Sequence, residues 1–443
     1  MEKTLNKIKS IIPRSAFDKL VPIYHFLLSL TGNIVYSKPS REIFVIGITG
    51  TKGKSSTAEI LNAILEEAGY KTAILSTVRF KIGNESRPNM LKMTMPGRFF
   101  VQKFLRDAVI KKCDYAIIEM TSEGAKNYRH RFVDMNALIF TNISPEHIES
   151  HGSFEKYLGA KLQIAKRLEH SQKSSKIIIA NKDDEKAEKF MAINVPNKIT
   201  YSIKEAEPFT LAKEGSVINL FGTRVQTYLP GEFNIYNILA AAKFAQSQGI
   251  KTETIKKAIE KLKFIPGRLE KVEIDLSKFK TEDNNKTLGN GIFPDFSVIV
   301  DYAHTADSLE KVYKIFKDDR KICVLGSCGG GRDKWKRPLM GEVADKNCDE
   351  IILTDEDPYD DDSEEIIKCV AGGMKDHKPK IILDRREAIR EAIRSAKAGD
   401  AVIITGKGTD PFIMKAKGNK IPWSDKRVAE EEILALALEK FKK

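Results

Sequence analysis

The sequence predicts an α/β protein with two domains, each built on a mostly parallel sheet. Short apolar runs of strand type alternate with helical patterns along most of the 443 residues, which is typical of a parallel sheet covered by helices. A glycine-rich stretch with a lysine follows one such strand at residues 47–55. A second alternating pattern begins after Pro266-Gly267, a dipeptide typical of a hinge.

The domain boundaries follow these changes of pattern. We expect a short N-terminal helical segment at residues 1–40, a central domain at 41–265 and a Rossmann-like C-terminal domain at 266–443. Residues 21–36 are mostly apolar but shorter than the roughly 20 residues that cross a bilayer. A helix docked on the central domain is therefore expected, with an interfacial membrane helix as the minor alternative.

The elements can be placed in order along the chain. Residues 199–229 carry short β-prone runs that predict a small antiparallel addition, and a helix is expected at 234–248. Residues 277–294 are rich in asparagine and glycine and predict an exposed loop. Strands are expected at 43–48, 72–76, 115–119, 137–141 and 176–180 in the central domain, and at 296–301, 321–326, 350–354, 380–383 and 401–405 in the second.

Composition is that of a soluble globular protein, at 42% hydrophobic and 30% charged residues with a net charge of +13. The lysines are spread along the chain without a recognisable nucleic-acid module, so an anionic small-molecule substrate explains the charge better than nucleic acid does. The five cysteines form no C-x-x-C pair, which favours reduced thiols in a cytoplasmic protein and no zinc site. We expect a monomer without membrane contact.

The stretch Val45 to Thr57, VIGITGTKGKSST, predicts a phosphate-binding loop. Its glycines let backbone N–H groups turn toward one point, which also faces the positive end of the following helix. Lys54 can reach β- and γ-phosphates, and the Ser55 hydroxyl can bind Mg²⁺. The usual P-loop spacing would place glycine at position 48, where this chain has Ile48. We therefore expect a P-loop ATPase domain with altered spacing, and a ligand-free glycine turn is the alternative.

Seven ordered stretches resemble the Mur ligases, ATP-dependent amide-bond-forming enzymes of cell-wall peptide synthesis. They lie at residues 47–55, 119–124, 141–147, 157–161, 231–237, 301–305 and 329–338. The Asp-Tyr-Ala-His and Arg-Asp-x-x-Lys-Arg-Pro motifs resemble one branch, the UDP-N-acetylmuramoyl-tripeptide synthetases. The resemblance covers about residues 43 to 430 and implies an ATP-dependent acid–amino-acid ligase.

The resemblance also implies a mechanism and its cofactors. A carboxylate is a poor electrophile, so ATP first converts it to an acyl phosphate, which the amine of an amino acid then attacks. Glu119 and His147 resemble the family's Mg²⁺ ligands, and Ser55 completes the metal site. Lys161 matches the lysine that CO₂ carbamylates in this family, a reaction that requires a neutral amine. The implied catalytic residues are therefore Lys54, Lys161, His147 and Glu119, with carbamylated Lys161 as a further metal ligand.

The nucleotide site implied by the resemblance draws on both domains. Asn234 matches the residue that reads the adenine edge, with a helix cap as the alternative, and Asp301 matches a ribose contact. Arg332 and Lys336 can meet phosphate when the domains close, and a solvated basic loop is their alternative. The expected ATP-binding residues are Gly50, Thr51, Gly53, Lys54, Ser55, Ser56, Asn234, Arg268, Asp301, His304, Arg332 and Lys336.

The substrate end departs from the family pattern. The Asp-Asn-Pro-Arg motif reads Glu-Asp-Pro-Tyr at 356–359, so the arginine that pairs with a carboxylate is missing. The acidic run at 360–362 can attract an ammonium group, which favours lysine or another diamino acid, and a solvated acidic turn is the alternative. Glu123 stands where the family pattern has a histidine. The expected acceptor and amino-acid residues are Thr94, Thr121, Ser122, Arg129, Asp357, Tyr359, Gly406 and Asp410.

Other functions remain as alternatives. Only about 40 residues precede the P-loop strand, where the family carries a UDP-binding domain, so a lipid-linked or other non-UDP acceptor stays open. A folylpolyglutamate-synthase-like ligase would share the ATPase core, but the motifs at 301–305 and 329–338 argue against it. A nucleotide switch would not need Glu119, His147 and Lys161. The amidating relative with a four-cysteine zinc insertion is disfavoured by the cysteine spacing.

Overall fold

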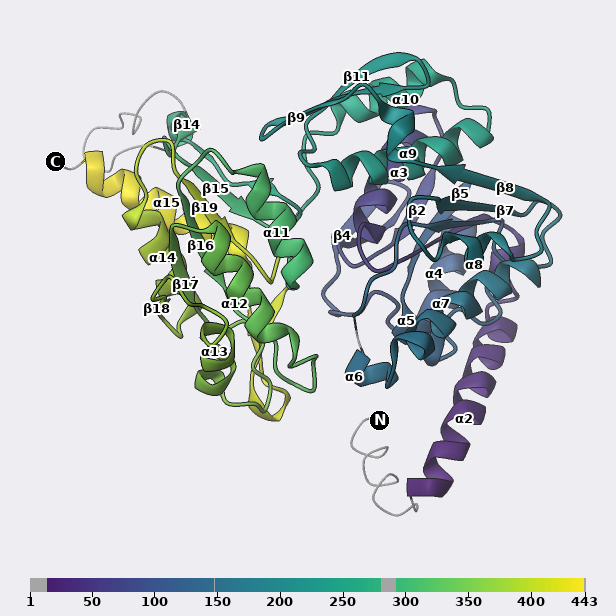
Figure 1. Cartoon of the computed structure of the whole chain (residues 1–443). Helices are drawn as coiled ribbons and strands as arrows, with labels where there is room; N and C mark the ends of the chain where they lie inside the picture. The colour runs from purple at the N-terminus through teal and green to yellow at the C-terminus, as the bar shows by residue number, and fades with distance from the viewer. Residues whose placement is uncertain (1–13, 147, 280–291, 442–443) are drawn as a thin grey trace.

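The structure is a computed structural model that describes residues 14–146, 148–279 and 292–441. Figure 1 shows the chain folded around two separate sheets, the first drawn in purple to teal and the second in green to yellow. The first sheet has eight strands and the second has six. The predicted α/β class, with a P-loop domain and a Rossmann-like domain, is confirmed. The division into domains at residue 265 stays a prediction.

The central sheet has the strand order β4-β3-β2-β5-β1-β6-β7-β8. Strand β1 lies in the middle and pairs in parallel with β5 and β6. The strands are β1 (Phe44–Thr49), β2 (Thr72–Leu75), β3 (Arg79–Ile82), β4 (Glu85–Pro88), β5 (Tyr115–Met120), β6 (Ala137–Phe140), β7 (Ile177–Asn181) and β8 (Asn197–Tyr201). The antiparallel edge hairpin β3–β4 was not predicted, because β4 is short and fully exposed and carries no apolar alternation.

Helices cover both faces of this sheet. Ile46 and Ile48 of β1 point to the face packed by α3 and α9, whereas Val45 points to the face packed by α4 and α7, as the two-residue period of a strand requires. The helices are α3 (Lys54–Glu67), α4 (Arg98–Ile110), α5 (Ser122–Lys126), α6 (Ile148–His151), α7 (Phe154–Glu169), α8 (Ala187–Met191), α9 (Glu232–Ser247) and α10 (Thr252–Lys261).

A small antiparallel sheet sits beside the central one, as predicted. It contains β9 (Thr210–Ala212), β10 (Gly215–Leu220) and β11 (Thr223–Thr227). The prediction was wrong in starting this addition at residue 199, because β8 pairs in parallel with β7 and belongs to the central sheet. A strand of five residues at a sheet edge gives too short a pattern to separate the two cases.

The second sheet has the order β12-β15-β19-β16-β17-β18, and only β12 pairs antiparallel. Its strands are β12 (Glu270–Lys271), β15 (Ser297–Val300), β16 (Lys321–Leu325), β17 (Glu350–Leu353), β18 (Lys380–Ile381) and β19 (Ala401–Ile404). Its helices are α11 (Ala306–Ile315), α12 (Lys336–Asn347), α13 (Ser363–Ala371), α14 (Arg385–Ser395) and α15 (Asp425–Phe441). Two short hairpin pairs join β13 (Ile274–Asp275) to β14 (Ile292–Phe293) and β20 (Phe412–Met414) to β21 (Lys420–Pro422). Most of the loop predicted at 277–294 lies outside the described residues.

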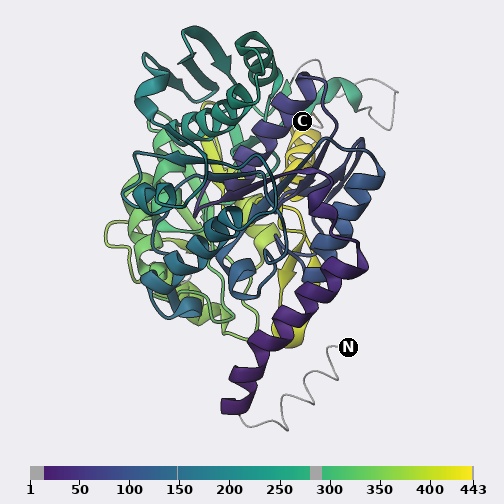
Figure 2. The same ribbon diagram turned by 90° about the vertical axis from the view of Figure 1, so that its right-hand side faces the viewer.

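The N-terminal helix α2 (Arg14–Val35) docks on the central domain at its C-terminal end. The Ser29 hydroxyl donates to the carbonyl of Tyr128 at 2.7 Å, and the Phe26 ring lies edge-on to Phe132. Figures 1 and 2 show the other end of α2 projecting away from the body of the molecule. Of the helices in the described ranges, none has the length and apolar character that crossing a bilayer requires.

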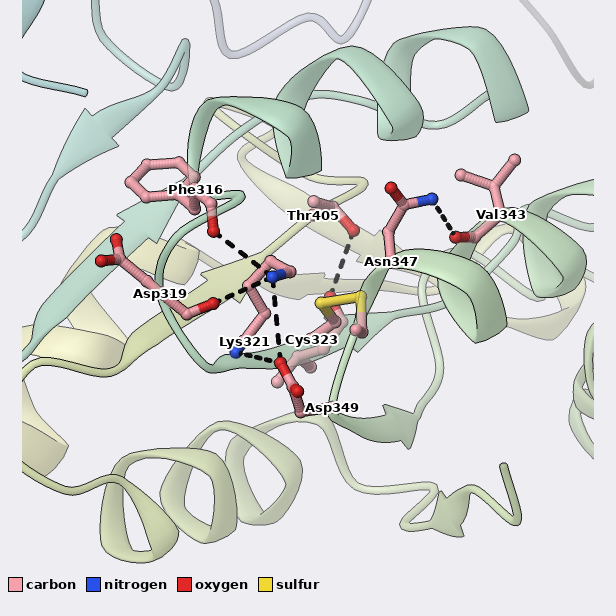
Figure 3. Close-up of a disulfide and its surroundings, with 10 residues drawn as sticks. Phe316, Asp319, Lys321, Cys323, Val343, Asn347, Asp349 and Thr405 are labelled. Atoms are coloured by element: carbon pink, nitrogen blue, oxygen red, sulfur yellow. Dashed lines mark hydrogen bonds and ion pairs between the residues drawn. A yellow bond between two sulfur atoms is a disulfide. The ribbon is translucent and has the colours of Figure 1, made fainter. Parts of the chain in front are cut away.

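Cys323 and Cys348 form a disulfide (Figure 3), so the expectation of reduced thiols is wrong for this pair. Cys323 lies on β16 and Cys348 directly follows α12, which leads back to the neighbouring strand β17. This crossover brings together two cysteines that are 25 residues apart. In the same turn, the backbone N–H of Lys321 donates to the Asp349 carboxylate at 2.7 Å. Cys113, Cys328 and Cys369 are free thiols.

A buried ion pair joins the last two helices of the C-terminal domain. Arg385 at the start of α14 donates to both oxygens of Asp425 at 2.8 and 2.7 Å, and both side chains have zero exposure. Arg385 also donates to the carbonyl of Thr405 at 2.7 Å. The pair therefore fixes the chain at the carboxyl end of β19, next to the cavity described below.

Replacing Arg385 by methionine should lower the free energy of unfolding by about 3–5 kcal/mol, because it leaves the Asp425 carboxylate buried without its partner. Chemical denaturation followed by circular dichroism measures this change. Arg427→Met is the control, since that arginine is 79% exposed in its pair with Glu431 and its loss should cost at most about 1 kcal/mol. Equal effects of the two substitutions would contradict this account.

Candidate active site

One large cavity of about 1640 Å³ lies between the two sheets and is lined by both parts of the chain. In this cavity, loops from the first sheet, which follow β1, β5 and β6, face loops from the second sheet, which follow β15, β16, β17 and β19. Open parallel sheets commonly bind ligands outside the carboxyl ends of their strands. The predicted site residues that line it are Thr51, Gly53, Lys54, Ser55, Ser56, Thr94, Glu119, Thr121, Ser122, Arg129, Asn234, Arg268, Asp301, His304, Arg332, Lys336, Asp357, Gly406 and Asp410.

Three of the predicted site residues that the structure describes, Gly50, Lys161 and Tyr359, are not among those that line the cavity. Gly50 is the first residue of the loop between β1 and α3, and Lys161 donates to its carbonyl. Tyr359 lies behind Gly330, where a Cβ would fall 2.7 Å from the tyrosine ring. His147 lies outside the described residues. The roles expected for these four residues therefore stay predictions.

The loop between β1 and α3 is shaped by glycine. Gly53 has a φ of +81°, and a Cβ at this position would fall 2.2 Å from the Asn237 amide oxygen of α9. Helix α3 begins at Lys54 without a side-chain cap, so no capping side chain accepts a hydrogen bond from the N–H groups of its first turn. Such a helix N-terminus faces an anion favourably.

Two lysines converge on a single carbonyl of this loop. Lys54 donates to the carbonyl of Gly50 at 3.0 Å, and Lys161 of α7 donates to the same oxygen at 2.6 Å. The Lys161 side chain is only 2% exposed. Burial, and then the neighbouring Lys54 ammonium, lower the pKa of Lys161 well below its usual value. Lys161 is therefore held where its neutral amine is favoured.

Ser55 and Glu119 place two hard oxygen donors beside the loop. The Ser55 hydroxyl donates to Glu119 at 3.0 Å, and the same carboxylate oxygen accepts the backbone N–H of Thr77 at 2.8 Å. A carboxylate and a hydroxyl fit Mg²⁺, which fills the rest of its shell with water and phosphate oxygens. In the described part of the chain, no group of three or more histidine, cysteine or carboxylate residues gathers as a metal site.

Contacts across the cavity tie the phosphate loop to the C-terminal domain. The Lys52 ammonium donates to the Thr305 hydroxyl at 2.7 Å, and Arg268 donates to the Ser55 hydroxyl at 3.3 Å. His304 Nε2 lies 3.1 Å from a carboxylate oxygen of Glu146. The loop after β15 therefore lies directly over the phosphate loop.

Asn234 and Asp301, predicted as nucleotide contacts, already bond to their own surroundings. The Asn234 amide donates to the carbonyl of Pro230 at 2.8 Å and accepts from Asn237 at 3.0 Å. The Asp301 carboxylate accepts the backbone N–H groups of Leu269 and Ala303 at 2.7 and 2.6 Å. Both side chains thus support the local backbone as well as lining the cavity.

The predicted acceptor residues lie on neighbouring loops of the central domain. Thr94 and Thr77 share a hydroxyl–hydroxyl bond of 2.7 Å, and Thr121 caps α5 by accepting the N–H of Gly124 at 3.0 Å. Arg129 donates to the carbonyl of Met95, and its Nε atom is buried without a partner. Hydrogen bonds from His151 and Ser150, acting against burial, lower the pKa of Glu123 to about 2, so this residue is an anion near the acceptor loops.

The opposite end of the cavity is rich in carboxylates. Asp357 and Asp410 pair with Lys407 and Lys92, and Glu356 beside them is 3% exposed. The thiol of Cys328 donates to one Glu356 oxygen at 2.9 Å, while the other oxygen is buried without a partner. Prediction missed Glu356 and Lys407, although Glu356 belongs to the motif at 356–359 and Lys407 directly follows the predicted residue Gly406. No sequence signal identifies Lys92.

Comparison with known proteins places this architecture in a family. The family models for the Mur ligase middle domain and for the Mur ligase glutamate ligase domain match residues 48–245 and 289–408. The chain belongs to the Mur ligase family. It is accordingly an ATP-dependent ligase, and the family uses Mg²⁺ with ATP.

Several named Mur ligases are similar over most of their length. The UDP-N-acetylmuramoyl-L-alanyl-D-glutamate–2,6-diaminopimelate ligases of Syntrophomonas wolfei and Clostridium botulinum are 36% and 35% identical, with 91% and 92% of this chain covering 81% of each. A solved structure of a ligase of that name has a TM-score of 0.57 at 26% identity, over 89% of this chain and 79% of its own. The Mycobacterium tuberculosis folylpolyglutamate synthase, at 17% identity and a TM-score of 0.63, covers 86% of this chain and 92% of its own, and it shares the fold.

Gly53→Ala should weaken nucleotide binding by about tenfold, since a side chain at positive φ costs roughly 1–3 kcal/mol and its Cβ would displace Asn237. A fluorescent ATP analogue measures this affinity. Gly159→Ala is the control, because nothing lies within 4 Å of that position on α7 and alanine suits a helix better than glycine. Unchanged affinity in Gly53→Ala would contradict the proposed role of the loop.

Proposed function

We propose that this Mur ligase adds a diamino acid to the carboxylate of a muramoyl-dipeptide acceptor through an acyl phosphate. The observation that carries the proposal is the large cavity, which has a phosphate loop with Ser55 and Glu119 at one end and a carboxylate cluster at the other. The names of the diaminopimelate ligases that the chain resembles include an acceptor of this kind, which supports a muramoyl dipeptide as the acceptor.

The reaction follows from this arrangement. The acceptor carboxylate attacks the γ-phosphorus of ATP, ADP leaves, and an acyl phosphate forms. The amine of the amino acid then attacks the acyl carbon, a proton is lost from nitrogen, and inorganic phosphate leaves. Mg²⁺ held by Ser55 and Glu119 would neutralise charge on the phosphates. Lys54 and the N-terminus of α3 stabilise the transferring phosphoryl group, and the loop after β15 excludes water from it.

The proposed preference for a diamino acid comes from the unpaired charge at the carboxylate end. A buried carboxylate oxygen without a partner, such as Oε2 of Glu356, is costly unless a cation reaches it. Tyr359 stands where an arginine would bind a second carboxylate. An amino acid with a distal ammonium group suits this end better than an acidic one does.

We propose that Lys161 is carbamylated in the active enzyme. Burial and the neighbouring Lys54 ammonium lower the pKa of Lys161 and favour its neutral amine, and its bond of 2.6 Å to the Gly50 carbonyl places that amine beside the phosphate loop. Addition of CO₂ to that amine releases a proton and leaves a carbamate anion, which is the charge that a metal site on this loop requires. The carbamate would also relieve the repulsion between Lys161 and Lys54.

Phosphate release tests the proposed function. With ATP, Mg²⁺ and UDP-MurNAc-L-Ala-D-Glu, we expect release only when L-lysine, diaminopimelate or another diamino acid is added, because the amine completes the reaction. Glu119→Gln should lower the rate at least about a hundredfold, since the metal loses an anionic ligand. Release that is independent of the amino acid, or that prefers L-glutamate, would contradict the proposal.

The carbamate can be observed directly. In ¹³C-bicarbonate, the wild-type protein should give a carbamate NMR signal that is absent from Lys161→Ala and that persists well below the usual pKa of a lysine, because the neutral amine of Lys161 stays populated there. The variant should retain nucleotide binding while losing phosphate release. A wild-type spectrum identical to that of Lys161→Ala would contradict carbamylation.

A further inference from the structure

Lys92 of the central domain reaches across the cavity into the carboxylate end of the C-terminal domain. Its ammonium nitrogen forms an ion pair with Asp357 and lies 3.1 Å from Asp410. Lys407 completes the group at 2.8 Å from Asp357 and 3.5 Å from Asp410. We call these four residues the Lys92 cluster. Two cations and two carboxylates balance within it.

The Lys92 cluster is largely shielded from water. The side chains of Lys407 and Asp357 are 0% and 2% exposed, and those of Asp410 and Lys92 are 11% and 16% exposed. Burial acts to lower the pKa of Lys92, but the carboxylates of Asp410 and Asp357 raise it above its usual value. If Lys92 withdrew, the cluster would hold one uncompensated carboxylate in a buried site, and Glu356, which has one oxygen without a partner, would add a second. The cluster therefore requires a cation where the Lys92 ammonium lies.

Lys92 is the member of this cluster that belongs to another domain. It lies on the loop between β4 and α4, two residues before Thr94, whereas the other three members follow β17 and β19. Its φ is +52°, a left-handed conformation that disfavours a residue with a Cβ. The contacts that offset this strain are at its tip, namely the two ion pairs and a hydrogen bond of 3.5 Å to the Phe412 carbonyl, so the loop can give them up when another cation takes the place of the ammonium group.

We propose that Lys92 holds, in the free enzyme, the position taken by the distal ammonium group of the incoming amino acid. The inference rests on the proposed function, since it requires a diamino acid. Both groups are primary ammonium ions on flexible carbon chains, so one can replace the other without loss of charge balance. A neutral side chain cannot make this exchange, because it would leave the carboxylates unpaired. Lys92 is thereby a specificity-determining residue, and its release frees the loop that carries Thr94.

Direct binding tests the exchange without relying on turnover. The full-length protein and its Lys92→Met variant are titrated by calorimetry with L-lysine, with diaminopimelate and with L-norleucine, the neutral analogue of lysine. Because a tethered group competes at an effective concentration in the millimolar range, removing it should tighten binding of the diamino acids about tenfold. L-norleucine should bind equally weakly to both proteins. Equal affinity for the diamino acids, no binding of them to either protein, or tighter binding of L-norleucine as well would overturn the proposal.

Two further variants separate exchange from structural damage. Lys213→Met removes another ion pair between the domains, at 2.9 Å to Asp319, and should leave amino-acid affinity unchanged. Lys92→Arg keeps the cation and should bind the diamino acids no more tightly than the wild type. In turnover, Lys92→Met should lower the KM for the amino acid while the KM for ATP stays constant. If no amino acid supports phosphate release by the wild type, the proposed function fails, and the calorimetric comparison still decides the role of Lys92.

Discussion

The active site depends on the hydrogen bonds that two lysines donate to the carbonyl of Gly50. Lys54 from α3 and Lys161 from α7 both donate to this one oxygen, so the phosphate loop is held against two helices by two buried lysine side chains. Two ammonium groups so close together repel each other in a site of low dielectric. This repulsion contributes to the lowered pKa of Lys161, and phosphate in front of the loop or the proposed carbamate on Lys161 would supply a compensating negative charge. The loop is thus organised for negative charge before any substrate binds.

The cavity has opposite charge at its two ends. Lys52, Lys54 and Arg268 lie at the phosphate end, and Glu356, Asp357 and Asp410 lie at the other. Under the proposed function, this polarity would order the substrates, with the nucleotide over the central domain and a cationic amino acid over the C-terminal domain. The loop that carries Thr94 lies between the two ends. An acceptor bound at this loop would present its carboxylate to both reacting partners. Catalysis then depends on holding the two domains in register.

Much of the fold and part of the arrangement of the candidate site could be predicted from the sequence. Parallel strands flanked by helices are marked by apolar runs of fixed period, and their carboxyl ends necessarily meet at one edge of a sheet. The resemblance grouped Ser55 and Glu119 in one metal site, and the structure brings them to 3.0 Å, because Glu119 lies on β5, the parallel neighbour of the strand β1 that leads to Ser55. The match to ordered motifs added the roles of residues that no periodicity identifies, such as Lys161.

What could not be predicted depends on contacts between distant segments. Lys92 and Asp357 are separated by most of the chain, and a lysine in a loop carries no sign of its partner. The Cys323–Cys348 disulfide depends on the path of the crossover through α12. The ends of α2 and the edge hairpin β3–β4 were missed because short or exposed elements show weak hydrophobic periodicity. These features follow from tertiary packing, which a local pattern does not encode.

Transfer of oxygen from acceptor to phosphate tests the central claim most directly, because it reports where the bonds form and break. The acceptor is prepared with ¹⁸O in its reactive carboxylate and incubated with the enzyme, ATP, Mg²⁺ and a diamino acid. We predict that each phosphate released carries one ¹⁸O atom, since the acyl phosphate cleaves between carbon and oxygen. Phosphate without ¹⁸O would show that ATP is hydrolysed by water, and it would contradict a ligase that joins its substrates in this cavity.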